Sequence, residues 1–187
     1  MDFDRQKKDI LGKIDKSKKN SIDTNIESLI NLINSKSNYY TSSSCSGRIM
    51  LIEKPDDKKQ NCRWMYVTHE LADINEVLSA TKKPFKGKLW FKFESVILHV
   101  SCNSLQDADN LLILIKGLGL KRSGIISLHK KIVIEIIGTE NVESLIGAES
   151  NLLVDETYLR AAIIDANEKM ALNFGKIAKL SSAVAKL

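Results

Sequence analysis

A run of small polar residues that ends in an arginine is the densest polar feature of the sequence. Residues 41–48 read Thr-Ser-Ser-Ser-Cys-Ser-Gly-Arg and join two segments of strand-like composition. Small residues let consecutive backbone N–H groups converge on an anion, and hydroxyls add further donors. Arg48 adds a planar guanidinium that suits a phosphate or a carboxylate. The run predicts an anion-binding loop, although an ordinary Ser/Gly-rich connection has the same composition.

A second cluster repeats this combination later in the chain. Residues 121–124 read Lys-Arg-Ser-Gly and directly precede another strand-like segment. Glycine permits a close approach of the backbone to a ligand. We expect the two loops to lie close together and to hold an anionic nucleic acid and a charged cofactor between them.

Two residues at the end of a strand-like segment are candidates for proton transfer. His69 and Glu70 follow residues 62–68, which are rich in β-forming side chains. Histidine exchanges protons near neutral pH, which suits a general base. The alternative interpretation of His69 is a histidine whose hydrogen bonds serve only the fold.

The common nucleotide and hydrolase motifs are missing. The only Gly-x-Gly, residues 117–119, ends a predicted helix, whereas a Rossmann site needs glycines that open one. The sequence contains no P-loop, no His-Glu-x-x-His and no Gly-x-Ser-x-Gly. The three histidines are spaced thirty residues apart. We therefore expect a non-Rossmann protein with no metal site.

The cysteines indicate a reducing compartment. Cys45, Cys62 and Cys102 are odd in number and far apart, and no Cys-x-x-Cys pair predicts a zinc or iron–sulfur centre. With no secretory signal in the sequence, we expect a cytoplasmic protein. Cys45 lies inside the serine run, so a cysteine-dependent nucleotide-handling enzyme is an alternative, although no nearby residue in the sequence would ionise the thiol.

Composition sets wider limits on the partners. The 187 residues include 43% hydrophobic and 27% charged residues, carry a formal net charge of +5 and have an isoelectric point near 9.0. This charge is compatible with a polyanionic partner but does not require one. The longest apolar candidate, residues 111–115, is far too short for a membrane span. We expect no membrane partner and no stable protein partner.

Hydrophobic periodicity predicts the elements that position these residues. Apolar side chains recur at helical spacing in the first 35 residues, where Asp23 is the expected N-cap of a second helix, and a basic turn is expected within residues 13–19. Other helices are expected after Asp73, after Ser104 and from residue 155 to about residue 180. Strands are expected at residues 39–41, 48–53, 62–68, 89–93, 96–101, 125–128 and 132–137.

This order of elements predicts an α+β fold. A mixed β-sheet of at least five strands would carry flanking helices, with an N-terminal helical pair and a long C-terminal helix. We expect residues 1–187 to form a single domain. Its parts would be a helical N-terminal region at 1–35, a mixed α/β core at 39–150 and a C-terminal helix at 155–187.

Several segments, spread in order over nearly the whole chain, resemble one known family. They are residues 40–49, Trp64, His69, residues 89–94, residues 97–102, residues 121–125, residues 158–159 and residues 167–169. In these segments the chain resembles the tRNA wybutosine-synthesis methyltransferase family, the third enzyme of the wyosine pathway, in its archaeal type. Ser42 departs from the family pattern, in which a second threonine is more common, but both residues offer a hydroxyl.

The resemblance implies a reaction and its reactants. It implies N(4)-methylation, dependent on S-adenosylmethionine, of a 4-demethylwyosine-type tricyclic guanosine 3′ of the anticodon in phenylalanine tRNA. It also implies a fold distinct from Rossmann methyltransferases. A non-catalytic RNA-binding module remains the second alternative to this reading.

Roles for individual residues follow from the chemistry of methyl transfer. The attacked ring nitrogen must lose a proton, and we expect His69 to accept it with Glu94 behind it. We expect the cofactor to bind at Ser43, Ser44, Ser46, Gly47 and Arg48. We expect the substrate to bind at Lys92, Arg122, Ser123 and Gly124, with Trp64 or Trp90 stacked on a flat ring. Packing in the core is the alternative for both tryptophans.

Overall fold

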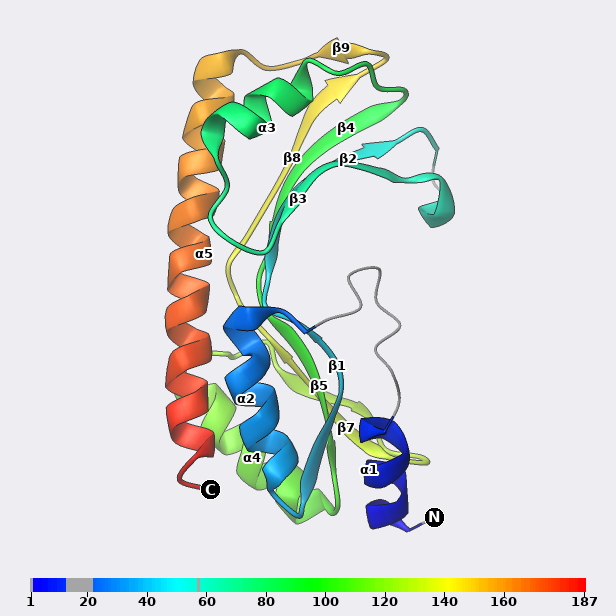
Figure 1. Cartoon of the computed structure of the whole chain (residues 1–187), viewed down its shortest axis with the longest axis vertical. Coiled ribbons are helices and arrows are strands. Elements are labelled where there is room, and N and C mark those ends of the chain that lie inside the picture. Colours follow the sequence, from blue (N-terminus) through cyan, green and yellow to red (C-terminus); the bar gives the residue numbers. More distant parts are fainter. Residues whose placement is uncertain (1, 13–21, 57) are drawn as a thin grey trace. The chain divides into compact units, whose positions relative to one another are not determined.

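The computed structural model describes residues 2–12, 22–56 and 58–187 (Figure 1). The basic turn expected within residues 13–19 lies outside them. The described chain divides into two compact units, each of which contains one antiparallel sheet. Unit 1 comprises Met1–Ser46, Val96–Thr139 and Asn173–Leu187, and unit 2 comprises Gly47–Ser95 and Glu140–Leu172. The assignment of residues 1–187 to a single domain stays a prediction.

Unit 1 is built on a four-stranded sheet in the order β1-β5-β7-β6. Every neighbouring pair in it is antiparallel. The strands are β1 (Tyr39–Cys45), β5 (Ile97–Cys102), β6 (Gly124–Ser127) and β7 (Ile132–Ile137). The helices are α1 (Phe3–Leu11), α2 (Thr24–Ser35), α4 (Leu105–Gly117) and the last turns of α5 (Glu156–Val184).

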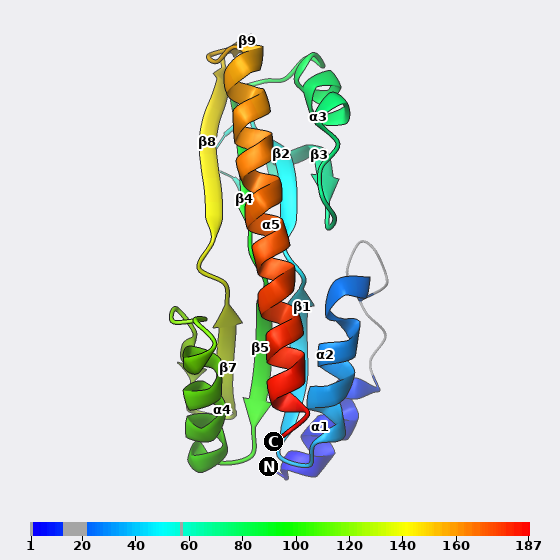
Figure 2. The ribbon, with the colours of Figure 1, turned by 90° about the vertical axis from the view of Figure 1, so that its left-hand side faces the viewer.

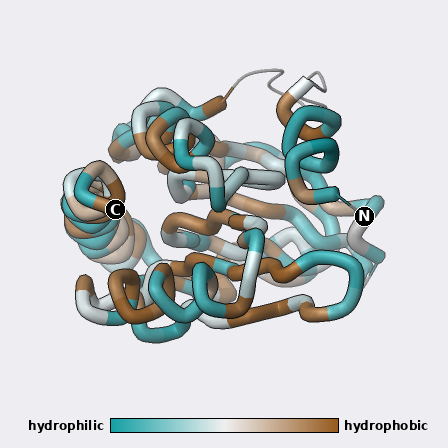
Figure 3. Tube along the Cα trace, turned by 90° about the horizontal axis from the view of Figure 1, so that it is seen from below, coloured by the Kyte–Doolittle hydropathy of each residue, from teal (hydrophilic) through white to brown (hydrophobic). Residues whose placement is uncertain are grey.

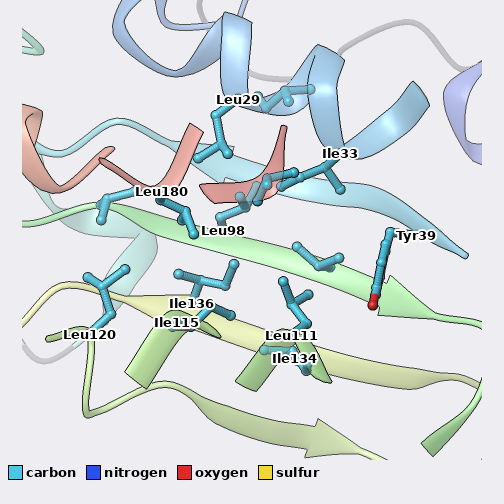
Figure 4. Packing of buried hydrophobic residues seen from close by; sticks show 14 of the residues in the cluster. Leu29, Ile33, Tyr39, Leu98, Leu111, Ile115, Leu120, Ile134, Ile136 and Leu180 are labelled. Atoms are coloured by element: carbon cyan, nitrogen blue, oxygen red, sulfur yellow. The ribbon is translucent and has the colours of Figure 1, made fainter. Parts of the chain in front are cut away.

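Alternating side chains give the unit 1 sheet a core face and an outer face. Leu98 and Val100 of β5 are fully buried, and they pack with Ile134 and Ile136 of β7 against α2, α4 and α5 (Figure 4). Helix α1 lies on the other side of β1 (Figure 1). Along the helices, hydrophobic and hydrophilic segments alternate, which matches helices that each bury one side (Figure 3).

Unit 2 is built on a five-stranded sheet in the order β3-β2-β4-β8-β9, again antiparallel throughout. Helix α3 and the first turns of α5 cover one face of it, and no helix of the described unit covers the other (Figures 1 and 2). The elements are β2 (Arg48–Lys54), the 3-10 turn η1 (Lys59–Asn61), β3 (Arg63–Thr68), α3 (Ile74–Thr81), β4 (Lys88–Glu94), β8 (Asn141–Ala148) and β9 (Asn151–Leu152).

The predicted α+β class is confirmed, with the N-terminal helices and the long C-terminal helix. The single mixed sheet is wrong in detail, because the strands form two antiparallel sheets. Strands β1 and β2 are consecutive in the chain but belong to different sheets. The same holds for β4 and β5. The chain changes unit between Ser46 and Gly47, where the φ of Gly47 is 105°. Only glycine adopts that backbone conformation without strain.

Two features of the sheets were not predicted. Strand β8 and its short partner β9 lie in a segment where no strand was expected, and β1 runs on to Cys45. The serine run is therefore mostly strand, and only Ser46 and Gly47 separate β1 from β2. None of the helices in residues 2–12, 22–56 and 58–187 is long and apolar enough to cross a membrane.

Candidate functional site

The uncovered face of the unit 2 sheet carries the polar and aromatic side chains. In β4, Leu89, Phe91 and Phe93 are fully buried against the helices. The residues between them point to the opposite face, as strand alternation requires. These are Lys88, Trp90, Lys92 and Glu94, and we call their side of the sheet the outer face. No helix of the described unit 2 covers this face.

At one end of the outer face, an arginine is held between an indole and a carboxylate. Arg48 and Glu94 are paired in register on β2 and β4. The Nε and Nη2 atoms of Arg48 donate to Oε2 of Glu94 at 3.0 and 2.7 Å. The guanidinium carbon lies 5.3 Å from the ring centroid of Trp64 on β3. The indole is 43% exposed, so a flat ligand can reach it.

Further along the same face, a second indole lies close to two lysines. The Nζ atoms of Lys54 and Lys92 are 5.6 and 5.5 Å from the ring centroid of Trp90. Lys92 also forms an ion pair with Glu143 of β8 at 2.5 Å. The Nε1 atom of Trp90 is buried and has no hydrogen-bond partner in the described chain. An aromatic ring flanked by cations suits the base and backbone of a nucleic acid.

His69 is oriented by a backbone carbonyl. Its Nδ1 lies 2.9 Å from the carbonyl oxygen of Gly47, in the same unit. A carbonyl oxygen can only accept, so Nδ1 carries the hydrogen in this contact. The lone pair of the neutral imidazole is then on Nε2, which is the atom that can take up a proton. The geometry suits the predicted general base, and that role stays a prediction.

Glu94 was predicted to act behind His69 as a second proton acceptor. Its carboxylate instead accepts two hydrogen bonds from Arg48. A carboxylate engaged in this way fixes the direction of the guanidinium, which is a positioning role. Participation of Glu94 in proton transfer stays a prediction, with no contact in the described chain that supports it.

Three of the predicted cofactor-binding residues, Ser43, Ser44 and Ser46, belong to unit 1, and they differ in their surroundings. Ser43 and Ser44 lie in β1, where they pair with His99 and Leu98 of β5. Ser43 is exposed and Ser44 is partly exposed, so both hydroxyls remain candidates for ligand binding.

Ser46 has a structural role. It is fully buried, and its backbone N–H and hydroxyl donate to Oδ2 of Asp23 at 2.9 and 3.1 Å. Its carbonyl oxygen accepts a hydrogen bond of 2.7 Å from Asn173. Asp23 is at the N-cap position of α2, as predicted, but its side chain makes no capping bond. These contacts hold the end of β1 in place, which explains a buried serine without a ligand.

The second predicted loop is also in unit 1. The hydroxyl of Ser123 is buried and accepts a hydrogen bond of 3.1 Å from the backbone of Ile137, which ties the start of β6 to β7. Gly124 pairs with Glu135 as the first residue of β6, and Arg122 is exposed in the preceding turn. Roles in substrate binding for these three residues stay predictions.

A continuous row of paired residues crosses the unit 1 sheet. Ser43 pairs with His99, His99 with Glu135, and Glu135 with Gly124. Ser43 and Gly124 thus lie on the two opposite edge strands of one sheet, with β5 and β7 between them, so the expectation that these two segments lie close together is wrong. The Nε2 atom of His99 lies 3.1 Å from Oε2 of Glu135 in the middle of the row. Local composition does not reveal this pair, because its partners are 36 residues apart.

The structure thus gathers five of the predicted site residues on one surface. Arg48, Trp64, Trp90, Lys92 and Glu94 share the outer face of unit 2. Three further residues of that face were missed: Lys54, Lys88 and Glu143. The alternation of large apolar with charged residues in β4 was the signal that could have revealed Lys88.

Burial makes the thiol of Cys102 unreactive. The thiol of Cys102 is in the core of unit 1, and burial, with the nearby Asp107 carboxylate, raises its pKa to about 12. Such a thiol stays protonated and unreactive at neutral pH. Cys45 is partly exposed, and its role as a nucleophile stays a prediction.

Comparison with known proteins identifies the class. The family model described as Methyltransferase TYW3 matches residues 5–186. A Thermococcus sibiricus protein named tRNA(Phe) 7-((3-amino-3-carboxypropyl)-4-demethylwyosine(37)-N(4))-methyltransferase is 42% identical over 99% of this chain and 95% of its own length. A tRNA wybutosine-synthesizing protein 3 homolog from Danio rerio is 37% identical over 97% of this chain and 74% of its own length.

Solved structures agree with the sequence comparison. The PH1069 protein of Pyrococcus horikoshii matches with a TM-score of 0.91 and 38% identity, over 97% of this chain and 95% of that one. A hypothetical protein from Aeropyrum pernix matches with a TM-score of 0.76 and 30% identity, over 88% and 98% of the two chains. Fold and sequence together define a methyltransferase outside the Rossmann class. The chain belongs to the TYW3 methyltransferase family, and the predicted resemblance is confirmed.

Proposed function

We propose that this protein transfers a methyl group from S-adenosylmethionine to N4 of a 4-demethylwyosine-type base, 3′ of the anticodon in phenylalanine tRNA. Membership of the family and the names of relatives such as the Thermococcus protein support this reaction. The structural observation that carries the proposal is the outer face of unit 2, where two indoles and three cationic side chains lie together.

The outer face suits a nucleic acid with an extended base. Bases that leave the helical stack are bound by stacking on aromatic rings, and a tricyclic base offers more area than guanine. Trp64 is the exposed ring, and Arg48 on its face keeps the indole in place. Lys54 and Lys92 beside Trp90 supply positive charge for the phosphates. Phosphate contacts position the strand, and the ring contacts select the modified base.

The proton from the substrate nitrogen goes to His69. Transfer of the methyl group that bound S-adenosylmethionine would supply requires the attacked nitrogen to lose its proton. The Gly47 carbonyl holds the Nδ1 hydrogen of His69 and leaves the lone pair on Nε2. With Nδ1 engaged by the carbonyl, Nε2 is the ring nitrogen that would accept the proton during or before attack.

A donor suited to the carboxylate of a sulfonium cofactor is present in unit 2. S-adenosylmethionine supplies an electrophilic methyl group when bound. The Arg48 guanidinium fits its carboxylate. In unit 1, the hydroxyls of Ser43, which is exposed, and of Ser44, which is partly exposed, stay predicted cofactor donors. Ser46 is already saturated by Asp23 and Asn173, so we do not assign it to the cofactor.

Two experiments separate this function from its alternatives. Calorimetry with S-adenosylmethionine distinguishes a methyltransferase from a non-catalytic RNA-binding module, which would bind no cofactor. A Cys45→Ala variant that still transfers the methyl group excludes the cysteine-dependent enzyme. Transfer of a labelled methyl group to tRNA that lacks only this modification tests the proposal itself.

A further inference from the structure

Two lysines face each other directly across neighbouring strands on the outer face. Lys54 of β2 and Lys88 of β4 are paired in register. Lys54 has its ammonium 5.6 Å from the ring centroid of Trp90. Lys88 is two residues before Trp90 in β4, so its side chain is on the same side of the sheet. The two side chains thus start from adjacent backbone positions and extend over one surface.

Such a pair is unfavourable for the fold alone. Like charges directly opposite each other on antiparallel strands destabilise the sheet. Further along these strands, the cations have acidic partners: Arg48 pairs with Glu94, and Lys92 pairs with Glu143. In residues 2–12, 22–56 and 58–187 no carboxylate lies within ion-pair distance of Lys54 or Lys88. Positive charge is therefore concentrated at this end of the outer face.

An unused hydrogen-bond donor accompanies the two ammonium groups. The Nε1 of Trp90, whose ring lies close to the ammonium of Lys54, is buried and has no acceptor within the described part of the chain. Leaving such a donor unsatisfied costs free energy, which an oxygen acceptor from a ligand would recover. Two cations and one N–H donor match the charge and the acceptors of a phosphate.

We propose that Lys54, Lys88 and Trp90 form a subsite that binds a backbone phosphodiester of the RNA strand. This inference rests on the proposed function and adds a contact that positions the strand without reading its sequence. The repulsion between the lysines is retained because the bound phosphate neutralises it. In the RNA-free protein the two like charges make the sheet less stable, but the anion site is already formed.

The test uses the full chain and an unmodified phenylalanine tRNA transcript, whose phosphates are those of the natural substrate. Affinity is measured over a series of salt concentrations for wild type, Lys54→Gln and Lys88→Gln. Each substitution should weaken binding several-fold at low salt and should reduce the slope of log affinity against log salt by about 1. Trp90→Phe should weaken binding with an unchanged slope, because it removes a neutral donor.

Lys82→Gln is the matched control. Lys82 is exposed at the end of α3, on the side of unit 2 that carries the helices, and its removal costs the same charge. The control should keep the wild-type slope. Lys88→Arg should also keep it, since the charge remains.

Stability gives an independent readout. Lys88→Glu would place opposite charges across the strands, so the melting temperature of the RNA-free protein should rise while tRNA binding falls. Lys88→Gln, with repulsion removed and no new ion pair, should have an intermediate melting temperature.

The outcomes distinguish the subsite from the function. If wild type methylates tRNA but Lys54→Gln and Lys88→Gln keep its salt slope, the subsite is wrong and the function stands. If Lys82→Gln reduces the slope equally, the effect is one of overall charge and the subsite is also wrong. If wild type neither binds nor methylates tRNA, the proposed function itself fails.

Discussion

Arg48 and Glu94 lie opposite each other on β2 and β4, joined by two hydrogen bonds to one carboxylate oxygen, with the guanidinium stacked on Trp64. The arginine is thus fixed by an acid on one side and an aromatic ring on the other. The carboxylate is about half exposed, so the pair contributes little to the stability of the sheet. The pair instead orients the Arg48 guanidinium beside the exposed indole of Trp64.

Arg48→Ala should therefore impair binding much more than folding. Loss of a charge-assisted bond to an anion costs about 1.5–3 kcal/mol, whereas an exposed ion pair contributes about 0–1 kcal/mol to stability. Binding isotherms for S-adenosylmethionine and tRNA, with a thermal melt of each variant, measure both quantities. Glu94→Gln is the control, because it keeps the arginine. A collapsed melting temperature with unchanged affinities would make Arg48 a structural residue.

Replacement of Trp64 should remove one stacking surface. Because the indole is 43% exposed, Trp64→Ala leaves no core cavity, and we expect a loss of about 1–3 kcal/mol in tRNA affinity with a small change in stability. Trp64→Phe should recover part of the loss. The chain has two tryptophans, so quenching of the remaining indole in a Trp90→Phe protein reports stacking at Trp64 directly. No quenching on addition of tRNA bearing the tricyclic base would argue against that contact.

His69→Ala should reduce the turnover number and leave tRNA affinity nearly unchanged. A general base acts in the transition state, so its loss affects kcat more than binding. A loss of about 100-fold or more is the usual size for such a group. His69→Gln is informative, because its amide can still donate to the Gly47 carbonyl but cannot accept the proton. If His69→Gln restores turnover, the histidine is needed for its hydrogen bond and not for proton transfer.

Alkaline conditions should weaken unit 1. Tyr39 and Cys102 are paired across β1 and β5, and burial, followed by the Asp107 carboxylate, raises the pKa of each to about 12. Their ordinary pKa values are lower, so the unfolded chain releases these protons first as the pH rises. The protonated Tyr39 and Cys102 therefore add to the free energy of unfolding in full below about pH 8.5. This contribution is lost as the pH rises from there to about 12.

Chemical unfolding at several pH values measures this dependence. Tyr39→Phe should flatten the alkaline decline, although it also removes the hydrogen bond of 3.0 Å from Tyr39 to the Asp107 carbonyl. Alkylation adds a second readout: at pH 8 the partly exposed thiol of Cys62 should react, while the buried thiol of Cys102 should not. Rapid alkylation of Cys102 in the native protein would contradict the burial argument.

The helices were predictable because local signals define them. Ser104 and Asp73 cap α4 and α3 as their positions in the sequence indicate, with side chains that accept from the backbone N–H three residues on. The division into two sheets was not predictable, since it depends on which strands pair over long distances. Strand β8 was missed because its eight residues include Glu143, Ser144 and Gly147, which weaken the strand pattern.

The site was predicted in its residue types but not in its arrangement. Local composition marked Arg48, Trp64 and Lys92, yet only the register of β2, β3 and β4 places them on one face. For Ser46 and Ser123 the sequence suggests ligand binding, but both residues are buried. The hydroxyl of Ser46 donates to Asp23, and the hydroxyl of Ser123 accepts from the backbone of Ile137. Hydrogen-bond partners far apart in the chain leave no local trace in composition.

Methyl transfer to tRNA with and without the tricyclic base tests the central claim most directly. Phosphate contacts are common to both RNAs, so an unmodified transcript should compete for binding, whereas only the tricyclic base presents N4 and the larger stacking area. The measurement is the incorporation of labelled methyl groups from S-adenosylmethionine into each RNA. We predict full incorporation into tRNA that carries the 4-demethylwyosine-type precursor and none into the unmodified transcript. Equal methylation of both RNAs, or none of either, would contradict the assignment.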